Sequence, residues 1–193
     1  MSGPGRDAVR VRPASVGDAG ALDELFAQLG YPQDPGAGAK GRIQLWNGDP
    51  ASAAFVAEAG GGVLGVIAVH VCPFFERPGS WGRIVALVVS DRARRRGVGA
   101  RLVAAAEAFA EARGCVRMEV TSADRRADAH GFYRGLGYAD EAGRSSRLLR
   151  DLPGGGTSCR LVRWGGGPPH RARAAAGGPG GAGERASVCF GDA

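Results

Sequence analysis

One segment of the chain combines an apolar run, three arginines and two glycines in an order that suits a bound anion. Leu87, Val88 and Val89 end a stretch that predicts a buried strand, and an amphipathic stretch that predicts a helix begins near Val98. Between them lies Arg94-Arg95-Arg96-Gly97, followed by Gly99. Glycines let a backbone approach a ligand closely, and the first turn of a helix presents N–H groups without partners. We therefore expect a cradle for a pyrophosphate, to which the arginines add charge.

Two familiar phosphate motifs do not match this segment. A P-loop requires Gly-Lys followed by Ser or Thr, which the chain lacks. A dinucleotide fingerprint requires a third glycine where Leu102 stands, and glycines directly after the strand, whereas seven residues separate Val89 from Gly97. Glu119 stands where that fingerprint has its ribose-binding acid, but inside a predicted strand. The sequence therefore favours a different phosphate compound.

Two motifs resemble the GNAT family, whose members transfer an acetyl group from acetyl-CoA to an amine. Arg94-Arg95-Arg96-Gly97-Val98-Gly99 matches the family's R/Q-x-x-G-x-G/A signature. The segment from Ala129 to Tyr138 resembles its A-x-x-F-Y-x-x-x-G-F/Y segment, and the phrase from Thr121 to His130 is similar to small-molecule members of its bacterial branch. The resemblance spans Val9 to Leu152 and implies a GNAT-like acyl-CoA N-acyltransferase fold.

The resemblance implies that acetyl-CoA is the co-substrate. The spacing of Cys159 and Cys189 with His170 matches no zinc pattern, so we expect no metal. The resemblance assigns the pantetheine arm to the backbone of the strand that ends at Val89, and implies that an N–H near Val88 polarises the thioester oxygen. The residues implied in cofactor binding are Leu87, Val88, Val89, Arg94, Arg95, Arg96, Gly97, Val98, Gly99, Ala100, Ser122 and His130.

The resemblance also implies the catalytic groups. Tyr133 matches the tyrosine that protonates the departing thiolate in many relatives, although the helical stripe around it also suits a packing aromatic. Many relatives carry an acidic base on the strand that corresponds to Ile84–Val89, which has none here. Glu119 is our candidate base, with a cross-strand ion pair as its structural role; His70, Glu76 or a chain of waters are the alternatives.

Hydrophobic periodicity predicts an α/β fold with a mixed sheet and the order β-α-α-β-β-β-α-β-α-β. The expected elements are a strand at 9–12, helices near 18–29 and 37–46, strands at 53–57, 63–71 and 84–89, a helix at 98–112, a strand at 116–120, a helix at 129–136 and a last strand at 145–152.

Composition divides the 193 residues into three parts. We expect residues 1–8 to be a flexible N-terminus, 9–152 an N-acetyltransferase domain, and 153–193 a disordered tail rich in Gly, Ala and Arg. The tail has five arginines against Glu184 and Asp192, which is half of the net charge of +6. The rest of the chain carries too little positive charge to predict nucleic-acid binding.

The cysteines and the apolar segments indicate where the protein acts. The four cysteines show no paired spacing, which favours reduced thiols and a cytoplasmic protein without metal. No apolar segment predicts a signal peptide or a membrane span. We expect a small-molecule amine as the acceptor, and the resemblance is compatible with a homodimer. The alternative functions are a non-catalytic acetyl-CoA-binding module and an RNA-associated protein that uses the basic tail.

Overall fold

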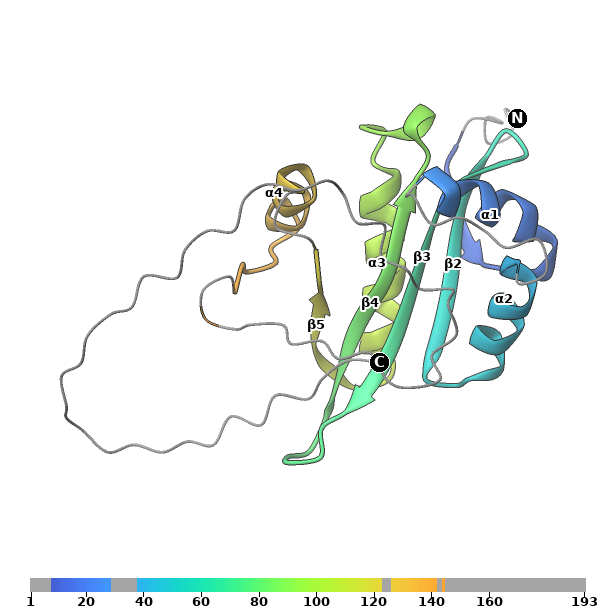
Figure 1. Cartoon of the computed structure of the whole chain (residues 1–193). Coiled ribbons are helices and arrows are strands. Elements are labelled where there is room, and N and C mark those ends of the chain that lie inside the picture. Colours follow the sequence, from blue (N-terminus) through green and yellow to red (C-terminus); the bar gives the residue numbers. More distant parts are fainter. Residues whose placement is uncertain (1–7, 29–37, 123–125, 142–143, 145–193) are drawn as a thin grey trace, which may run out of the picture. The chain divides into compact units, whose positions relative to one another are not determined.

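The computed structural model describes residues 8–28, 38–122, 126–141 and 144. The chain divides into two units, residues 1–138 and 139–193, and almost all described residues belong to the first. In chain order its elements (Figure 1) are β1 (Arg10–Pro13), the short 3-10 helix η1 (Val16–Asp18), α1 (Ala19–Gln28), α2 (Ala39–Gly48), β2 (Ser52–Ala59), β3 (Gly62–Pro73), β4 (Ser80–Val89), the 3-10 helix η2 (Asp91–Ala93), α3 (Val98–Glu111), β5 (Cys115–Val120) and α4 (Ala127–Gly135).

The strands form one mixed five-stranded sheet in the order β1-β2-β3-β4-β5. All neighbours are antiparallel except β4 and β5, which are parallel and are joined through α3. In the β3–β4 pairing, Ala68 lies opposite Ala86 while Val69 lies opposite Ile84, so Val85 is an extra residue that bulges from β4. This arrangement confirms the predicted mixed α/β fold.

Helices cover both faces of the sheet. One face carries α3, whose apolar stripe of Leu102, Val103 and Ala106 packs on β3 and β4, and α4 joins the same cluster through Phe132 and Tyr133. The other face carries α1 and α2, which pack on Val56, Val66 and Val88. Strand residues alternate between these two clusters, because successive side chains of a strand point to opposite faces. The face of each polar strand residue can therefore be read from its apolar neighbours.

The predicted elements and the observed ones agree in type. The structure differs most at β4, which begins at Ser80 rather than Ile84, because Trp81, Gly82 and Arg83 extend the pairing with β3 and β5 without an apolar pattern. The predicted strand at 145–152 and the predicted tail at 153–193 lie outside the described residues. No helix in the described part of the chain is long and apolar enough to span a membrane.

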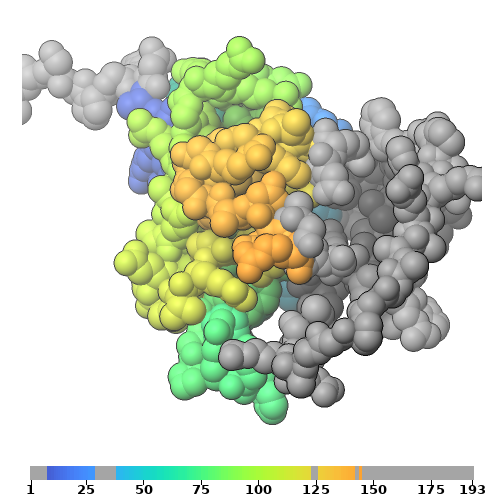
Figure 2. Space-filling model, turned by 90° about the vertical axis from the view of Figure 1, so that its left-hand side faces the viewer, coloured from blue at the N-terminus to red at the C-terminus, as the bar shows by residue number. Residues whose placement is uncertain are grey.

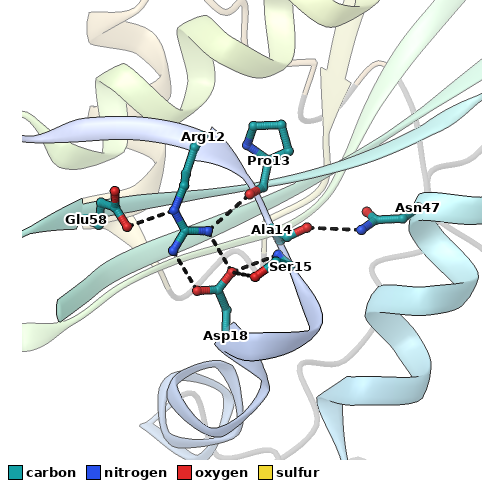
Figure 3. A network of polar contacts seen from close by, with 7 residues as sticks. All are labelled: Arg12, Pro13, Ala14, Ser15, Asp18, Asn47 and Glu58. Carbon is teal, nitrogen blue, oxygen red and sulfur yellow. Dashed lines mark hydrogen bonds and ion pairs between the residues drawn. The ribbon is translucent and has the colours of Figure 1, made fainter. Parts of the chain in front are cut away.

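An arginine network fixes the first strand to the helices that follow it (Figure 3). Arg12 donates to both carboxylate oxygens of Asp18 at 2.7 Å and to Glu58 at 2.8 Å. Asp18 also accepts from the backbone N–H and the hydroxyl of Ser15. Asn47 of α2 donates to the carbonyl of Ala14 at 3.0 Å. These bonds hold β1, η1, β2 and α2 together at one side of the sheet.

Candidate active site

The loop that leads into α3 is anchored at its start and open at its end. Ser90 is buried and its N–H donates to the carbonyl of Leu64 at 2.8 Å, which fixes the exit of β4. Beyond η2, Arg94, Arg95 and Arg96 are exposed, and Arg94 pairs with Asp91 at 2.8 Å. The sequence-predicted arginines therefore surround the N-terminus of α3 without being buried by it.

The N-terminus of α3 has no side-chain cap. Gly97 is the N-cap residue, with a left-handed backbone at φ +73°, and no side chain bonds to the first turn. The first N–H that bonds within the helix is that of Arg101, which donates to the carbonyl of Gly97, so the N–H groups of Val98, Gly99 and Ala100 are available to a ligand. Uncapped N–H groups and the positive end of the helix dipole favour an anion. This local geometry fits the predicted phosphate cradle.

Helix α4 packs against this same first turn. A Cβ placed on Gly99 would lie 3.1 Å from the ring of Phe132 and 3.7 Å from Val89. In Figure 2 the orange atoms of α4 lie directly beside the lime-green atoms of the segment that enters α3. Gly99 therefore allows a close helix contact in addition to any approach by a phosphate. His130 and Tyr133 flank Phe132 in the sequence, so the contact also brings these two residues to the end of the sheet where α3 begins.

The strands β4 and β5 separate halfway along β4. Their pairing runs from Ser80 and Cys115 to Ile84 and Val120 and then ends. From Ala86 to Val89, β4 pairs with β3 alone among the described strands. Figure 1 shows β5 leaning away from β4 toward the end where α4 stands. The backbone groups that Leu87, Val88 and Val89 turn toward β5 are therefore available to an extended ligand, and Ser122 follows β5 at the open end.

Tyr133 lies in an aromatic cluster on the α3 side. Its ring contacts Phe132 and Tyr138 edge-on, with centroid distances of 5.1 and 5.4 Å. Burial raises the pKa of Tyr133 to about 12, and its hydroxyl makes no hydrogen bond to a described residue. The hydroxyl of Tyr138 donates to Glu107 at 2.9 Å. Of the two phenols, Tyr138 is committed to the fold, whereas Tyr133 keeps a protonated hydroxyl for another partner.

Glu119, the candidate base, forms the ion pair that its strand position suggested. Its carboxylate lies 3.9 Å from the guanidinium of Arg83, which also donates to the hydroxyl of Thr121 at 3.1 Å. Arg83 and Glu119 are direct neighbours in the parallel pairing, one residue before it ends. Glu119 therefore lies where the two strands begin to separate.

The other two candidate bases lie in different surroundings. Glu76 lies in the loop between β3 and β4, at the end of the sheet where β4 and β5 are still paired. Within the described chain its only ion pair is with Arg77. His70 is paired with Arg83 across β3 and β4, so it lies one strand from the Arg83–Glu119 pair. Its Nδ1 is 2.8 Å from the hydroxyl of Ser52. The structure brings His70 and Glu119 to the same site and leaves Glu76 outside it.

Sequence reasoning missed a cavity on the α1 side of the sheet. It measures about 520 Å³ and lies beside the Arg12 network, between α1, the β2–β3 turn and the start of η2. Arg12 holds the pKa of Asp18 down at about 2, mainly through its hydrogen bonds. The Ser15-x-x-Asp18 spacing signals a helix start but not this network, because Arg12 and Glu58 are distant in sequence. The cavity lining includes none of Arg94 to Arg96, Tyr133, Glu119 or His70.

No group of three or more metal-ligating side chains forms among residues 8–28, 38–122, 126–141 and 144. Two of the cysteines, Cys72 and Cys115, are described, and they form no disulfide with each other. Burial raises the pKa of the Cys115 thiol. Within the described chain, the candidate site consists of the N–H groups at the start of α3, the unpaired edge of β4 at 87–89, the phenol of Tyr133, and the polar side chains of His70, Arg83 and Glu119.

Comparison with family models gives one match. The model of the acetyltransferase (GNAT) family matches residues 22–138, which includes the cradle, both diverging strands and Tyr133. A comparison with curated protein sequences gave no match.

Comparison with solved structures gives many matches of low sequence identity. A transcriptional regulator from Bacillus halodurans C-125 matches with a TM-score of 0.66 and 22% identity, over 75% of this chain and 100% of that one. Glucosamine-6-phosphate N-acetyltransferase from Arabidopsis thaliana matches with a TM-score of 0.63 and 18% identity, over 76% and 99%. AAC(6')-Iy, in complex with the bisubstrate analogue CoA-S-monomethyl-acetylneamine, matches with a TM-score of 0.63 and 17% identity, over 75% and 97%. At these identities the likeness shows a shared fold.

Proposed function

Because the chain belongs to the acetyltransferase (GNAT) family, we propose that it transfers the acetyl group of acetyl-CoA to a primary amine of a small molecule. Family membership implies acetyl transfer from an acyl-CoA donor. The amine acceptor, its small size and membership of the bacterial small-molecule branch are our proposal. The observation that carries it is the meeting of an uncapped helix N-terminus with an unpaired strand edge, beside a protonated phenol.

In this proposal the pyrophosphate of acetyl-CoA binds at the start of α3. The N–H groups of Val98, Gly99 and Ala100 donate to it, Gly97 permits the turn, and Arg94, Arg95 and Arg96 screen its charge. The pantetheine arm takes the place that a further strand would have beside Leu87, Val88 and Val89. Ser122 and His130 are the remaining cofactor-binding candidates. Ser122 follows the last paired residues of β4 and β5, and His130 lies on α4. Both positions are on the open side of the site.

Acid–base chemistry in this proposal uses groups on both sides of the separating strands. Tyr133 donates the proton that the departing thiolate of coenzyme A needs, and its raised pKa keeps it protonated at neutral pH. An alkylammonium ion must lose a proton before its nitrogen can attack, since its pKa is near 10. Glu119 and His70 are the two side chains at the site that can accept this proton, directly or through water.

The proposed acceptor and setting follow from chemistry and from the relatives. One solved neighbour is named as a glucosamine-6-phosphate N-acetyltransferase, and another is in complex with a bisubstrate analogue that contains an acetylneamine part; glucosamine and neamine are both amino sugars. We propose an acceptor of this size, a cytoplasmic setting that keeps Cys72 and Cys115 reduced, no nucleic-acid partner and no metal. A homodimer is compatible with this function but is not needed for it.

The test measures the release of free thiol from acetyl-CoA when one amine at a time is added. The panel comprises glucosamine 6-phosphate, neamine, spermidine and a peptide with a free N-terminus, and calorimetry measures acetyl-CoA binding separately. We expect micromolar to millimolar binding of acetyl-CoA and amine-dependent thiol release. Binding without turnover for any amine would favour the non-catalytic module, and absence of acetyl-CoA binding would contradict the proposal altogether.

A further inference from the structure

Four polar side chains lie side by side across the sheet at the level where β4 and β5 separate. Ser52 pairs with His70, His70 pairs with Arg83, and Arg83 pairs with Glu119, on four consecutive strands. Ala54 and Ala68 lie two residues along β2 and β3 from this row, and Ala86 lies three residues along β4 because Val85 is an extra residue there; the three alanines are in register with one another. Ala54 packs in the cluster under α1 and α2, so the polar row lies on that same face, opposite α3.

A chain of hydrogen bonds fixes His70 at one of its two ring nitrogens. The hydroxyl of Ser52 lies 2.6 Å from Oδ2 of Asp49 and 2.8 Å from Nδ1 of His70. Asp49 also accepts from the N–H of Ala51, and these bonds lower the pKa of Asp49, so its carboxylate is ionised. An ionised carboxylate only accepts, so the single proton of Ser52 points to Asp49. Ser52 can then only accept from His70, and the proton of the neutral imidazole lies on Nδ1.

This assignment leaves Nε2 of His70 with an unshared electron pair. No described residue bonds to Nε2, and the imidazole is 38% exposed. The groups that face the ring are Asp49, 3.6 Å from Nδ1, the ring of Trp46 from α2 with its centroid 6.5 Å away, and Arg83 from β4, with Glu119 beyond Arg83. His70 is therefore an oriented imidazole, partly open to solvent, on the face of the sheet opposite α3.

Resting on the proposed acetyl transfer, we propose that Nε2 of His70 accepts the proton of the acceptor amine, and that Ser52 and Asp49 are positioning residues for it. The order Asp49–Ser52–His70 differs from a nucleophilic triad, in which the histidine stands between the other two. Here the serine is the middle member, its proton is used by the aspartate, and it is 8% exposed. The hydroxyl therefore orients a base and does not act as a nucleophile.

His70, Tyr133 and water account for every proton that moves in the proposed reaction. The ammonium gives one proton to Nε2 of His70, and the nitrogen lone pair forms the C–N bond to the thioester carbon. The C–S bond breaks, sulfur keeps the electron pair and takes a proton from Tyr133. The nitrogen loses its second proton to water as the amide forms, Tyr133 regains a proton from solvent, and His70 releases its proton to solvent. No further reactant is needed.

His70 fits this role better than the two carboxylates. Imidazole is a stronger base than a carboxylate in its ordinary state. Glu119 has its charge balanced by Arg83, and Glu76 lies in the loop beyond the paired ends of β4 and β5. In the row, Arg83 of β4 lies between the imidazole of His70 and Glu119 of β5.

The first experiment compares His70→Asn with Glu119→Gln and the wild type. Asparagine can keep an N–H close to the place of Nδ1, so the bond to Ser52 is retained while Nε2 is removed. The acceptor is the amine of the panel that the wild type turns over fastest. We expect His70→Asn to lower kcat about 10²–10⁴-fold with little change in the KM for acetyl-CoA or in Tm. Glu119→Gln should cause a smaller loss, and added imidazole should restore part of the rate to His70→Ala.

The second experiment needs no acceptor. Nitrogen-15 NMR of the neutral His70 ring reports which nitrogen carries the proton. We expect the Nδ1–H form in the wild type and a mixture of both forms in Ser52→Ala, together with a lower kcat and an unchanged acetyl-CoA Kd. A hydroxyl that merely supported the strand would alter Tm without altering the tautomer.

The outcomes separate this inference from the proposed function. A wild type that neither binds acetyl-CoA nor releases thiol contradicts the function. An active wild type with an equally active His70→Asn overturns only the inference, as does a larger loss in Glu119→Gln than in His70→Asn. An Nε2–H ring in the wild type overturns it too, whether or not an acceptor has been found.

Discussion

Gly99 of α3 lies so close to Phe132 of α4 that even a methyl side chain at this position would be tight against the phenyl ring. A Cβ on Gly99 would lie 3.1 Å from Cζ and 3.3 Å from Cε2 of Phe132. The residue after Phe132 is Tyr133, whose ring contacts that of Phe132 edge-on. The second glycine of the arginine-glycine segment therefore fixes where the proposed acid lies, in addition to leaving the helix N-terminus open.

We predict that Gly99→Val destabilises the protein and weakens acetyl-CoA binding more than Arg95→Ala does. Overpacking at such a contact costs about 1–3 kcal/mol, because Phe132 and α4 must move. Urea unfolding and calorimetry measure the two effects. Arg95 is exposed and forms no ion pair within the described chain, so its loss should remove only charge.

Gly131→Ala is the matched control, because a Cβ at this α4 position meets nothing within 4 Å. It should leave stability unchanged or raise it by about 0.5–1 kcal/mol through helix propensity. Phe132→Leu should recover part of the stability lost in Gly99→Val. If the two changes were strictly additive, the Gly99–Phe132 contact would not be the cause.

We predict a different pattern at Gly97, where a Cβ meets no atom but the backbone is left-handed. Gly97→Val should cost about 1–2 kcal/mol or more, because branched side chains are strained there, whereas Gly97→Asn should cost less. If acetyl-CoA phosphates approach this backbone, Gly97→Asn will still bind acetyl-CoA more weakly than the wild type. If Gly97→Asn bound acetyl-CoA as tightly as the wild type and had nearly the same free energy of unfolding, the role of Gly97 would be purely conformational.

The elements of the sheet and helices could be predicted from the sequence because their periodicity is local. The stripe of Leu102 and Ala106 and the alternation of Val116, Met118 and Val120 identify α3 and β5 without tertiary information. The first four residues of β4 could not be predicted in this way. Trp81, Gly82 and Arg83 have no apolar period, and only their partners on β3 and β5 make them a strand.

The candidate site could be predicted only where one continuous segment builds it. The cradle from Arg94 to Ala100 is such a segment, and the uncapped α3 terminus agrees with it. His70, by contrast, is 18 residues from Ser52 and 13 residues from Arg83 in the sequence, and no spacing rule connects them. Strand register brings them together, since Ser52 pairs with His70 across β2 and β3 and His70 pairs with Arg83 across β3 and β4.

We predict that Asp18→Asn destabilises the protein at neutral pH and that this cost disappears in acid. Asp18 is 7% exposed, and Arg12 lowers its pKa from 3.8 to about 2. The ion pair therefore stabilises the fold fully above about pH 4, and its contribution is lost as pH falls toward 2. The shift corresponds to about 2 kcal/mol. Urea unfolding at pH 7 and near pH 2.5 measures the difference.

Asp91→Asn is the control for this prediction. Asp91 pairs with Arg94 at 2.8 Å, but both side chains are well exposed, so the expected loss is below about 1 kcal/mol. A loss in Asp18→Asn that was equally small at pH 7, or one that stayed constant down to pH 2.5, would show that the Arg12 network does not stabilise the fold as described.

The last prediction concerns the phenol of Tyr133. Tyr133→Phe keeps the ring that packs on Phe132 and Tyr138 and removes only the hydroxyl, which bonds to no described residue. We expect kcat to fall about 10²-fold, the lower end of the range for general acid catalysis, because a thiolate is already a tolerable leaving group. Tm and acetyl-CoA Kd should hardly change. Since the pKa of Tyr133 is about 12, its ionisation should not limit the rate anywhere between pH 6 and 10.

Tyr138→Phe should show the opposite behaviour and is therefore the matched control. Its hydroxyl donates to Glu107 of α3, so its removal leaves that carboxylate without this donor and should lower Tm by a few degrees. The kcat of Tyr138→Phe should stay near that of the wild type, because this phenol is held by α3. Steady-state kinetics and thermal unfolding of both variants give the comparison.

If Tyr133→Phe turned over at the wild-type rate, the thiolate would have to take its proton from water or His130, and Tyr133 would be a packing residue. If both variants lost activity equally, the loss would stem from displacement of α4 and not from a missing proton donor.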